Sequence, residues 1–131
     1  MEKVPLILIV DDEPSFAEIF SIKLNTAGFR VEIATNGELG VRKAKEIKPD
    51  LVLMDVQMPV MNGVEAIQAL RNDPETKDQK VVFLTNMGDS LPGGLEADQR
   101  GASDMGALGY IRKTDDLDNL LTTIKGYLGG H

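Results

Sequence analysis

The sequence contains no cysteine and no tryptophan, and its aromatic residues are four phenylalanines and two tyrosines. Without cysteine the protein has no disulfides, thiolate nucleophile or zinc–cysteine site, and we expect it in a reducing compartment, the cytoplasm. Long apolar runs are also missing. Residues 6–10 form the longest uninterrupted one, far short of the roughly 20 residues that span a bilayer. Acids follow this run at once, where a signal peptide would carry its cleavage region, so we expect no membrane segment.

Basic residues are scarce relative to acidic ones. Fourteen lysines and arginines stand against 21 aspartates and glutamates, which gives a net charge of −7. Phosphate backbones require clustered basic side chains, so direct nucleic-acid binding is disfavoured and protein partners are expected. The length of 131 residues fits one domain. We expect that domain to cover residues 1–131, with its core at about 4–128 and a flexible tail, 129–131.

Strand and helix patterns alternate along the chain. The strand patterns are residues 6–10, 30–34, 51–55, 81–85 and 109–112. Between them, Pro14 opens a helical pattern that Gly28 ends, Asn36 is placed to cap a second helix, and a third follows from about Asn62. Apolar strands separated by helices predict a parallel sheet that is covered on both faces.

Polar side chains terminate four of these predicted strands. They are Asp11, Asp12, Asp55, Thr85 and Lys113. Ligands of parallel α/β sheets bind outside the carboxyl ends of the strands, so these side chains are expected at one edge, where clustered acids indicate a divalent metal. Each residue alone has an ordinary structural explanation, such as a helix cap for Asp55 or a solvated strand end for Lys113. Their joint placement favours a site.

These residues make the chain resemble the receiver domain of two-component response regulators, the family that includes the chemotaxis regulator. The resemblance covers about residues 4–128. It rests on the acid pair Asp11-Asp12, the block Leu53-Met54-Asp55-Val56-Gln57-Met58-Pro59 with Gly63, Thr85, and the run from Gly106 to Lys113. It implies a flavodoxin-like three-layer α/β sandwich, with a five-stranded parallel sheet of order 2-1-3-4-5 and five helices.

The resemblance also implies a phosphoryl-accepting site. Asp55 would be the nucleophile, because a carboxylate can take a phosphoryl group as an acyl phosphate. The donor would be a sensor histidine kinase, a phosphotransfer protein or a small phosphodonor. Mg²⁺, with Mn²⁺ as an alternative, would be held directly by Asp12, Asp55 and the main-chain carbonyl of Gln57, and through water by Asp11.

Three further residues are implied to bind the phosphoryl group or to respond to it. Lys113 would form a salt bridge with the phosphoryl group, and the Thr85 hydroxyl would donate a hydrogen bond to it. Thr85 would then move, Tyr110 would turn inward, and the surface of the fourth helix, fifth strand and fifth helix would change. Tyr110 as an ordinary strand aromatic is the equally weighted alternative.

Two local departures from the family pattern affect the site. Thr114 follows Lys113 where many members have proline, so a cis peptide is not expected there, and Thr114 or Asp115 is expected to cap the last helix. Asn86 stands where the family commonly has a small residue. Together with Gln57 and Met87, it is expected to modulate access of phosphodonor or water to Asp55.

Contact surfaces are the least determined feature. In this family the first helix helps to dock the kinase or phosphotransfer protein, which makes Phe16 and Ile19 candidates, with Phe16 the one expected to be exposed. The segment from Asn86 to Met105 is long and rich in glycine, so the fourth helix is expected to be short, shifted or mobile. A tolerated loop insertion is equally favoured. We expect a monomer or a weak phosphorylation-dependent dimer.

Other classes of protein explain the sequence less well. An aspartyl-phosphate phosphatase needs a second acid two positions after the nucleophile, where this chain has Gln57, so no turnover of outside substrates is expected. A receiver-like module that works without phosphorylation typically loses an acid, the threonine or the lysine, and none is lost here. The extent of the chain favours a stand-alone regulator over a fragment of a larger regulator or hybrid kinase.

Overall fold

The computed structural model describes residues 4–58, 60–86, 90–91, 95–96, 103 and 106–129. Its main elements are β1 (Leu6–Val10), α1 (Pro14–Thr26), β2 (Arg30–Ala34), α2 (Gly37–Ile47), β3 (Leu51–Asp55), α3 (Gly63–Arg71), β4 (Val81–Thr85), β7 (Gly109–Arg112) and α5 (Leu117–Tyr127). All strand pairings in the main sheet are parallel, and its order is β2-β1-β3-β4-β7. Since β7 is the fifth strand of this sheet, the predicted order 2-1-3-4-5 is confirmed.

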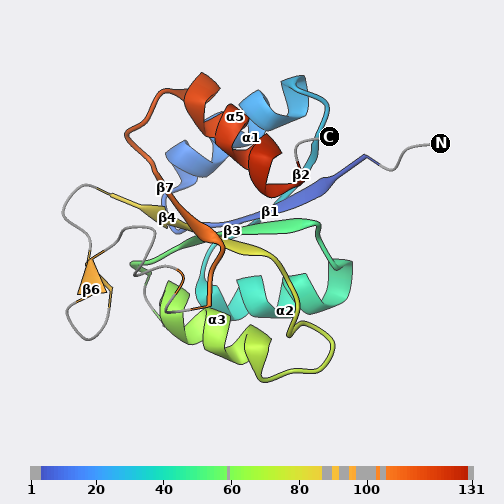
Figure 1. Cartoon of the computed structure of the whole chain (residues 1–131), viewed down its shortest axis with the longest axis vertical. Coiled ribbons are helices and arrows are strands. Elements are labelled where there is room, and N and C mark those ends of the chain that lie inside the picture. Colours follow the sequence, from blue (N-terminus) through green and yellow to red (C-terminus); the bar gives the residue numbers. More distant parts are fainter. Residues whose placement is uncertain are drawn as a thin grey trace.

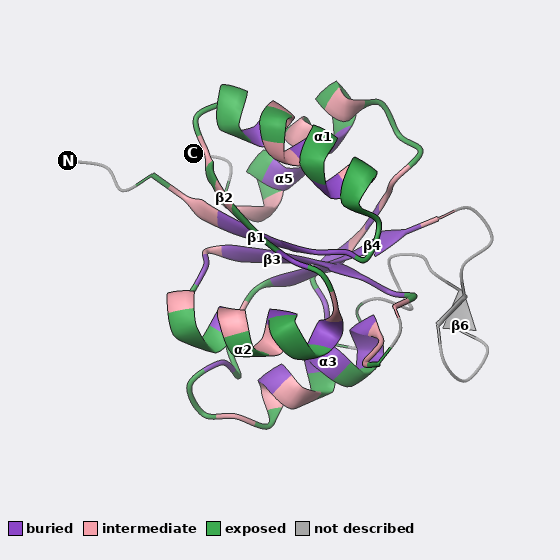
Figure 2. Ribbon diagram, turned by 180° about the vertical axis from the view of Figure 1, so that it is seen from behind, coloured by how far each residue is buried: buried purple, intermediate pink, exposed green. Residues whose placement is uncertain are grey.

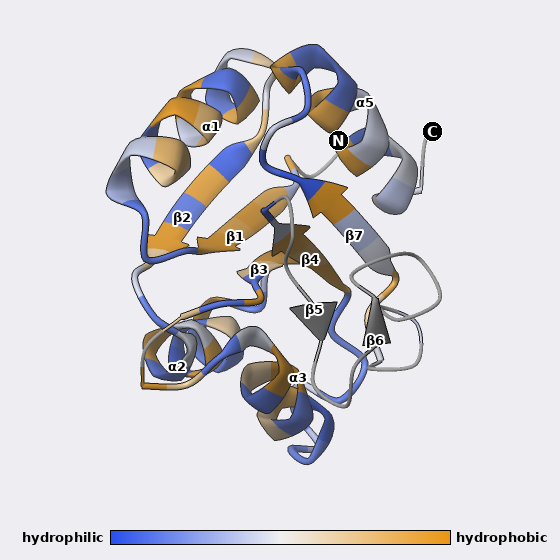
Figure 3. Cartoon of the chain, turned by 90° about the vertical axis from the view of Figure 1, so that its left-hand side faces the viewer, coloured by the Kyte–Doolittle hydropathy of each residue, from blue (hydrophilic) through white to orange (hydrophobic). Residues whose placement is uncertain are grey.

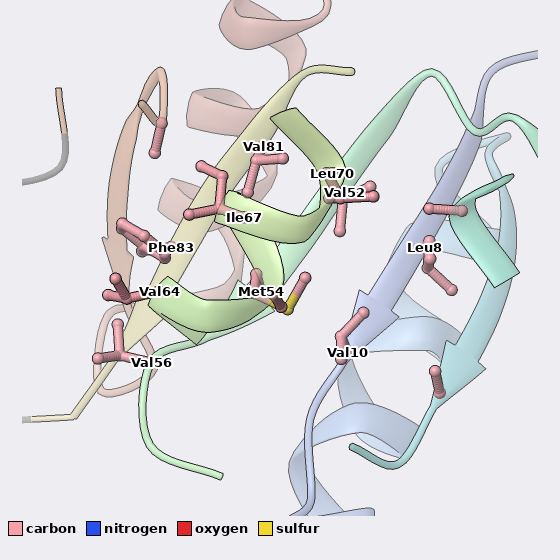
Figure 4. Packing of buried hydrophobic residues seen from close by; sticks show 14 residues of the cluster. Leu8, Val10, Val52, Met54, Val56, Val64, Ile67, Leu70, Val81 and Phe83 are labelled. Atoms are coloured by element: carbon pink, nitrogen blue, oxygen red, sulfur yellow. The ribbon is translucent and has the colours of Figure 1, made fainter. Parts of the chain in front are cut away.

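The helices form one layer on each face of the sheet, with α1 and α5 on one side and α2 and α3 on the other (Figure 1). The strands β1, β3 and β4 are buried (Figure 2) and strongly apolar (Figure 3). Their alternating side chains divide the core in two. One half packs under α2 and α3, where Ile67 and Leu70 of α3 face Val52 and Val81 (Figure 4). The other half packs under α1 and α5. Burial on both faces explains why these strands read as continuous apolar runs.

Helix starts follow the expected signals at three of the four helices. Pro14 stands at the first position of α1, and Asn36 caps α2 by accepting a hydrogen bond from the Leu39 amide. Asn62 caps α3 within a complete capping box. The prediction for the last helix was wrong, because Asp116, and not Thr114 or Asp115, caps α5 by accepting a hydrogen bond from the Asp118 amide. No cis peptide occurs among the described residues.

Four helices have bounds in the described residues, and the expected fourth helix of the fold falls in the segment from Asn86 to Met105, where Ser103 is described as helical. Most of that segment lies outside the described residues. Within it, β5 (Ser90–Leu91) and β6 (Leu95–Glu96) pair as antiparallel strands, so these four residues do not belong to a helix. None of the helices in the described part of the chain combines the length and apolar character that crossing a bilayer would need.

Val60, in the loop between β3 and α3, has a φ of +70° and is 76% exposed. A β-branched residue in this left-handed region is strained by about 1–2 kcal/mol, whereas asparagine tolerates it. We expect Val60→Asn to raise the free energy of unfolding by about 1 kcal/mol in urea denaturation. Val4→Asn, at another exposed valine, is the control, and equal stabilities of the two variants would contradict the strain.

Candidate functional site

Three carboxylates meet where β1 and β3 end. Asp11 and Asp12 follow β1, and Asp55 is the last residue of β3. One oxygen from each lies within 4.8 Å of the others. Asp11 and Asp55 are each 1% exposed, whereas Asp12 is exposed to solvent. The adjacent, parallel β1 and β3 bring these acids to one edge, as the strand-end pattern predicted.

Lys113, just beyond β7, lies among the acids, and its side chain is only 4% exposed. Its ammonium nitrogen is 3.0 Å from Asp55 Oδ2, 2.8 Å from Asp11 Oδ2 and 2.7 Å from Glu13 Oε1. The contacts with Asp55 and Glu13 are hydrogen bonds, while the geometry with Asp11 Oδ2 is that of an ion pair alone. The second oxygens of both buried acids accept backbone amides, Asp11 from Glu13 and Asp55 from Gln57.

The local environment shifts the pKa values of this group. Burial raises the pKa of Asp55 to about 7, against the hydrogen bond and charge of Lys113, which lower it, and the neighbouring Asp11 adds to the rise. Burial alone would lower the pKa of Lys113, but its carboxylate partners outweigh burial and raise it. The Lys113 hydrogen bond lowers the pKa of Glu13. The Lys113 ammonium therefore only partly offsets the effect of burial on the charged Asp55 carboxylate.

Thr85 and Tyr110 lie on the neighbouring strands. Thr85 ends β4 and is fully buried, and its hydroxyl donates a hydrogen bond to the Ile111 carbonyl of β7 at 3.3 Å. Tyr110 is half-buried against the core half under α2 and α3, and the Arg112 guanidinium lies 5.4 Å from its ring centre. The Thr85 hydroxyl is thus engaged by backbone at the edge where the acids meet.

The residues predicted to modulate access are only partly described. Gln57 is exposed beside Asp55, and Asn86 Nδ2 lies 3.5 Å from Glu13 Oε1. Met87 lies outside the described residues.

The prediction that Phe16 is the exposed residue among Phe16, Ile19 and Phe20 was wrong. Its ring is partly buried, 5.5 Å from that of Phe20, and the Lys113 ammonium lies 5.3 Å from its centre. Ile19 is the exposed residue of the predicted pair, at 55%. Ile22, which the sequence did not single out, is also exposed.

Gly63, the first residue of α3, fixes the distance between that helix and the site. A Cβ atom at this position would lie 2.3 Å from the Asp55 carbonyl oxygen and 3.0 Å from the Val56 Cα. Both neighbours are backbone atoms, so any larger residue would have to displace the end of β3.

The donor set fits a hard divalent cation. Mg²⁺ prefers carboxylate and carbonyl oxygens and is commonly bound through one or two carboxylates. Asp11, Asp12 and Asp55 supply three such groups, and with Glu13 they outnumber the single ammonium of Lys113. Burial is the main cause of the raised pKa of Asp55, and the charge of Asp11 adds to the rise. A cation at these oxygens would favour the charged carboxylate.

Glu13 is the residue of this site that sequence reasoning left without a role. Its position directly after the acid pair was visible, but its bond to Lys113, 100 residues away, depends on how β1 and β7 are placed in the fold. A hollow of about 450 Å³ lies elsewhere, between Pro5, Pro49 and Lys80 at the opposite ends of the strands. It takes no part in this constellation.

The fold and this site define a class of protein, the doubly wound α/β proteins that carry clustered acids and a lysine at the carboxyl edge of a parallel sheet. The family model of the response regulator receiver domain matches residues 7–125. The chain belongs to the response regulator receiver domain family.

Individual relatives are similar over nearly all of this chain. Protein PilH of Pseudomonas aeruginosa is 38% identical over 124 residues, which cover 95% of this chain and 98% of PilH. The DNA-binding dual master transcriptional regulator RpaA of Synechocystis is 34% identical over 125 residues, 95% of this chain but 49% of RpaA. The chain thus spans about half the length of RpaA. The structure of chemotaxis protein CheY4 of Vibrio cholerae aligns with a TM-score of 0.81 and 30% identity, covering 95% of this chain and 99% of CheY4.

Proposed function

We propose that the protein accepts a phosphoryl group on Asp55 and signals through the resulting change of its surface. The observation that carries the proposal is the buried Asp55 carboxylate, which shares Lys113 with Asp11 at the carboxyl edge of the sheet. A carboxylate oxygen of Asp55 attacks the phosphorus, and the bond from phosphorus to the donor breaks. With a phosphohistidine donor, the electron pair of that bond returns to the imidazole nitrogen.

The neighbouring residues supply charge compensation and positioning, which dominate phosphoryl transfer. Asp11, Asp12, Asp55 and the Gln57 carbonyl would hold Mg²⁺ or Mn²⁺, and the bound cation would neutralise charge on the phosphoryl oxygens. Lys113 is within reach of Asp55 Oδ2 and can turn its ammonium to a phosphoryl oxygen. The Thr85 hydroxyl can exchange the Ile111 carbonyl for a phosphoryl oxygen.

The response begins at Thr85 in this proposal. Movement of its side chain would loosen its bond to β7 and let Tyr110 turn inward from its half-buried position. The surface of β7 and α5, with the segment preceding β7, would then change. The phosphoryl group carries roughly −1.5 to −2 charges at neutral pH in place of the charge of the Asp55 carboxylate, and these new anionic oxygens are enough to shift a population between two states of a packed domain.

The partners we propose are a sensor histidine kinase or phosphotransfer protein as the donor, and a protein target. Ile19 and Phe16 lie on α1, which starts next to the site, so a donor that reaches Asp55 would pass close to them. Gln57 stands two residues after Asp55, where an aspartyl-phosphate phosphatase would need its second acid. We therefore propose signalling without turnover of outside substrates.

Intact-mass spectrometry after incubation with acetyl phosphate and Mg²⁺ tests the proposal. The native chain should gain one phosphoryl group, and the gain should disappear in Asp55→Ala and in native protein treated with a chelator. Asp115→Ala, at an exposed aspartate beyond β7, should label like the native chain. If the native chain remains unlabelled under conditions that label another receiver domain, acceptance of a phosphoryl group from small donors is refuted. Labelling by a phosphorylated histidine kinase would then show that the chain requires a protein donor. No labelling by the kinase either would indicate a module that works without phosphorylation.

A further inference from the structure

We propose that the Glu13 carboxylate holds Lys113 in the unphosphorylated protein and releases it when a phosphoryl group occupies Asp55. We call this contact the Glu13 clamp. This inference rests on the proposed function and assigns a positioning role to a residue outside the acceptor and metal-binding set. The clamp joins three loops, since one oxygen of Glu13 lies 2.7 Å from Lys113 Nζ and 3.5 Å from Asn86 Nδ2. These partners follow β7 and β4, while Glu13 follows β1.

Phosphorylation would add anionic partners to a lysine that already contacts three carboxylates. An ammonium group has three N–H donors, and Lys113 faces three carboxylates, those of Asp11, Glu13 and Asp55. A phosphoryl group on Asp55 would bring further anionic oxygens to the same ammonium. Lys113 now donates hydrogen bonds to Glu13 and Asp55 and forms an ion pair with Asp11. The phosphoryl oxygens would compete with these partners for the ammonium group.

Exposure decides which partner leaves. The side chains of Asp11 and Asp55 are 0% and 2% exposed, whereas that of Glu13 is 51% exposed. A buried carboxylate without a partner is costly, but a carboxylate released into water is rehydrated. Glu13 is therefore the partner that Lys113 exchanges.

The local structure permits this exchange without disrupting α1. Glu13 occupies the cap position of α1, but its side chain makes no capping hydrogen bond to the helix. Its backbone amide, by contrast, donates to Asp11 Oδ1 at 2.8 Å and can stay in place while the side chain turns away. Rotation of the Glu13 side chain would leave the acid cluster assembled. It would break the contacts of Glu13 Oε1 with both Lys113 and the Asn86 amide group.

The affinity for beryllofluoride at saturating Mg²⁺ tests the clamp, because this anion is a non-covalent mimic of a phosphoryl group. Glu13→Gln should bind it about fivefold more tightly than the native chain, since binding no longer displaces a charged partner from Lys113. Glu18→Gln removes the same charge from an exposed position on α1 and should leave the affinity almost unchanged. The rate of labelling by acetyl phosphate should rise in the same order.

Glu13→Asp separates the contact from the charge. It keeps the carboxylate but shortens the side chain by one methylene, so it should lose its reach to Lys113 and behave like Glu13→Gln. Native affinity in both Glu13 variants, or equal gains in Glu13→Gln and Glu18→Gln, overturns the clamp while leaving the proposed function intact. A native chain that takes neither beryllofluoride nor phosphoryl group refutes the proposed function and this inference together.

Discussion

Lys113→Met is expected to lower the free energy of unfolding of the metal-free protein by about 3–5 kcal/mol at pH 8, the usual cost of removing one partner from a buried ion pair. Methionine replaces most of the aliphatic stem but not the ammonium. Asp11 and Asp55, each 1% exposed, would then lie close together without their shared cation. Urea denaturation followed by circular dichroism, in the presence of a chelator, measures the loss.

Two further measurements identify the cause of this loss. The penalty should shrink at pH 5, because Asp55, whose pKa is raised to about 7, then carries little charge for Lys113 to compensate. Mg²⁺ should stabilise Lys113→Met more than the native chain, since a bound cation replaces the missing charge. Lys77→Met, at an exposed lysine, should change stability by less than about 0.5 kcal/mol. A Lys113→Met protein as stable as this control would show that the acids do not depend on Lys113.

The sheet and its polar edge could be predicted from the sequence because both depend on local pattern. Strands buried on both faces, such as β3, are apolar at successive positions up to their last residue, which in β3 is Asp55. A parallel sheet then places every strand end at one edge without further information. The caps Asn36 and Asn62 are equally local, since each bonds an amide three residues away.

The errors and omissions concern features that depend on tertiary packing. The bond from Glu13 to Lys113 spans 100 residues and has no local signature. Phe16 and Ile19 both fit the helical pattern, and only the packing of Phe16 against Phe20 decides which of them is exposed. At the start of α5 several consecutive polar residues can cap a helix, so the pattern did not separate Asp116 from its neighbours.

Asp55→Asn is expected to abolish most of the pH dependence of stability that the metal-free protein shows between about pH 4 and 7. Burial raises the pKa of Asp55 from 3.8 to about 7 on folding, so the native state binds a proton that the unfolded state has lost. Stability is then highest below the unfolded pKa, falls as the pH rises through the window, and is constant above the folded value. A shift of this size corresponds to a fall on the order of 4 kcal/mol.

Asparagine has nearly the shape of a protonated aspartic acid and carries no charge at any pH of this window. The variant should therefore match the native chain near pH 4 and exceed its free energy of unfolding by a few kcal/mol at pH 8, in urea denaturation with a chelator. Asp115→Asn, at an exposed aspartate, is the control and should keep the native dependence of stability on pH. Mg²⁺ should weaken this dependence in the native chain, because a cation favours the charged carboxylate. The prediction is contradicted if the native protein becomes more stable as the pH rises from 4 to 7 and the Asp55→Asn variant shows the same profile. That result would mean that Lys113 outweighs burial and that Asp55 is charged throughout this pH range.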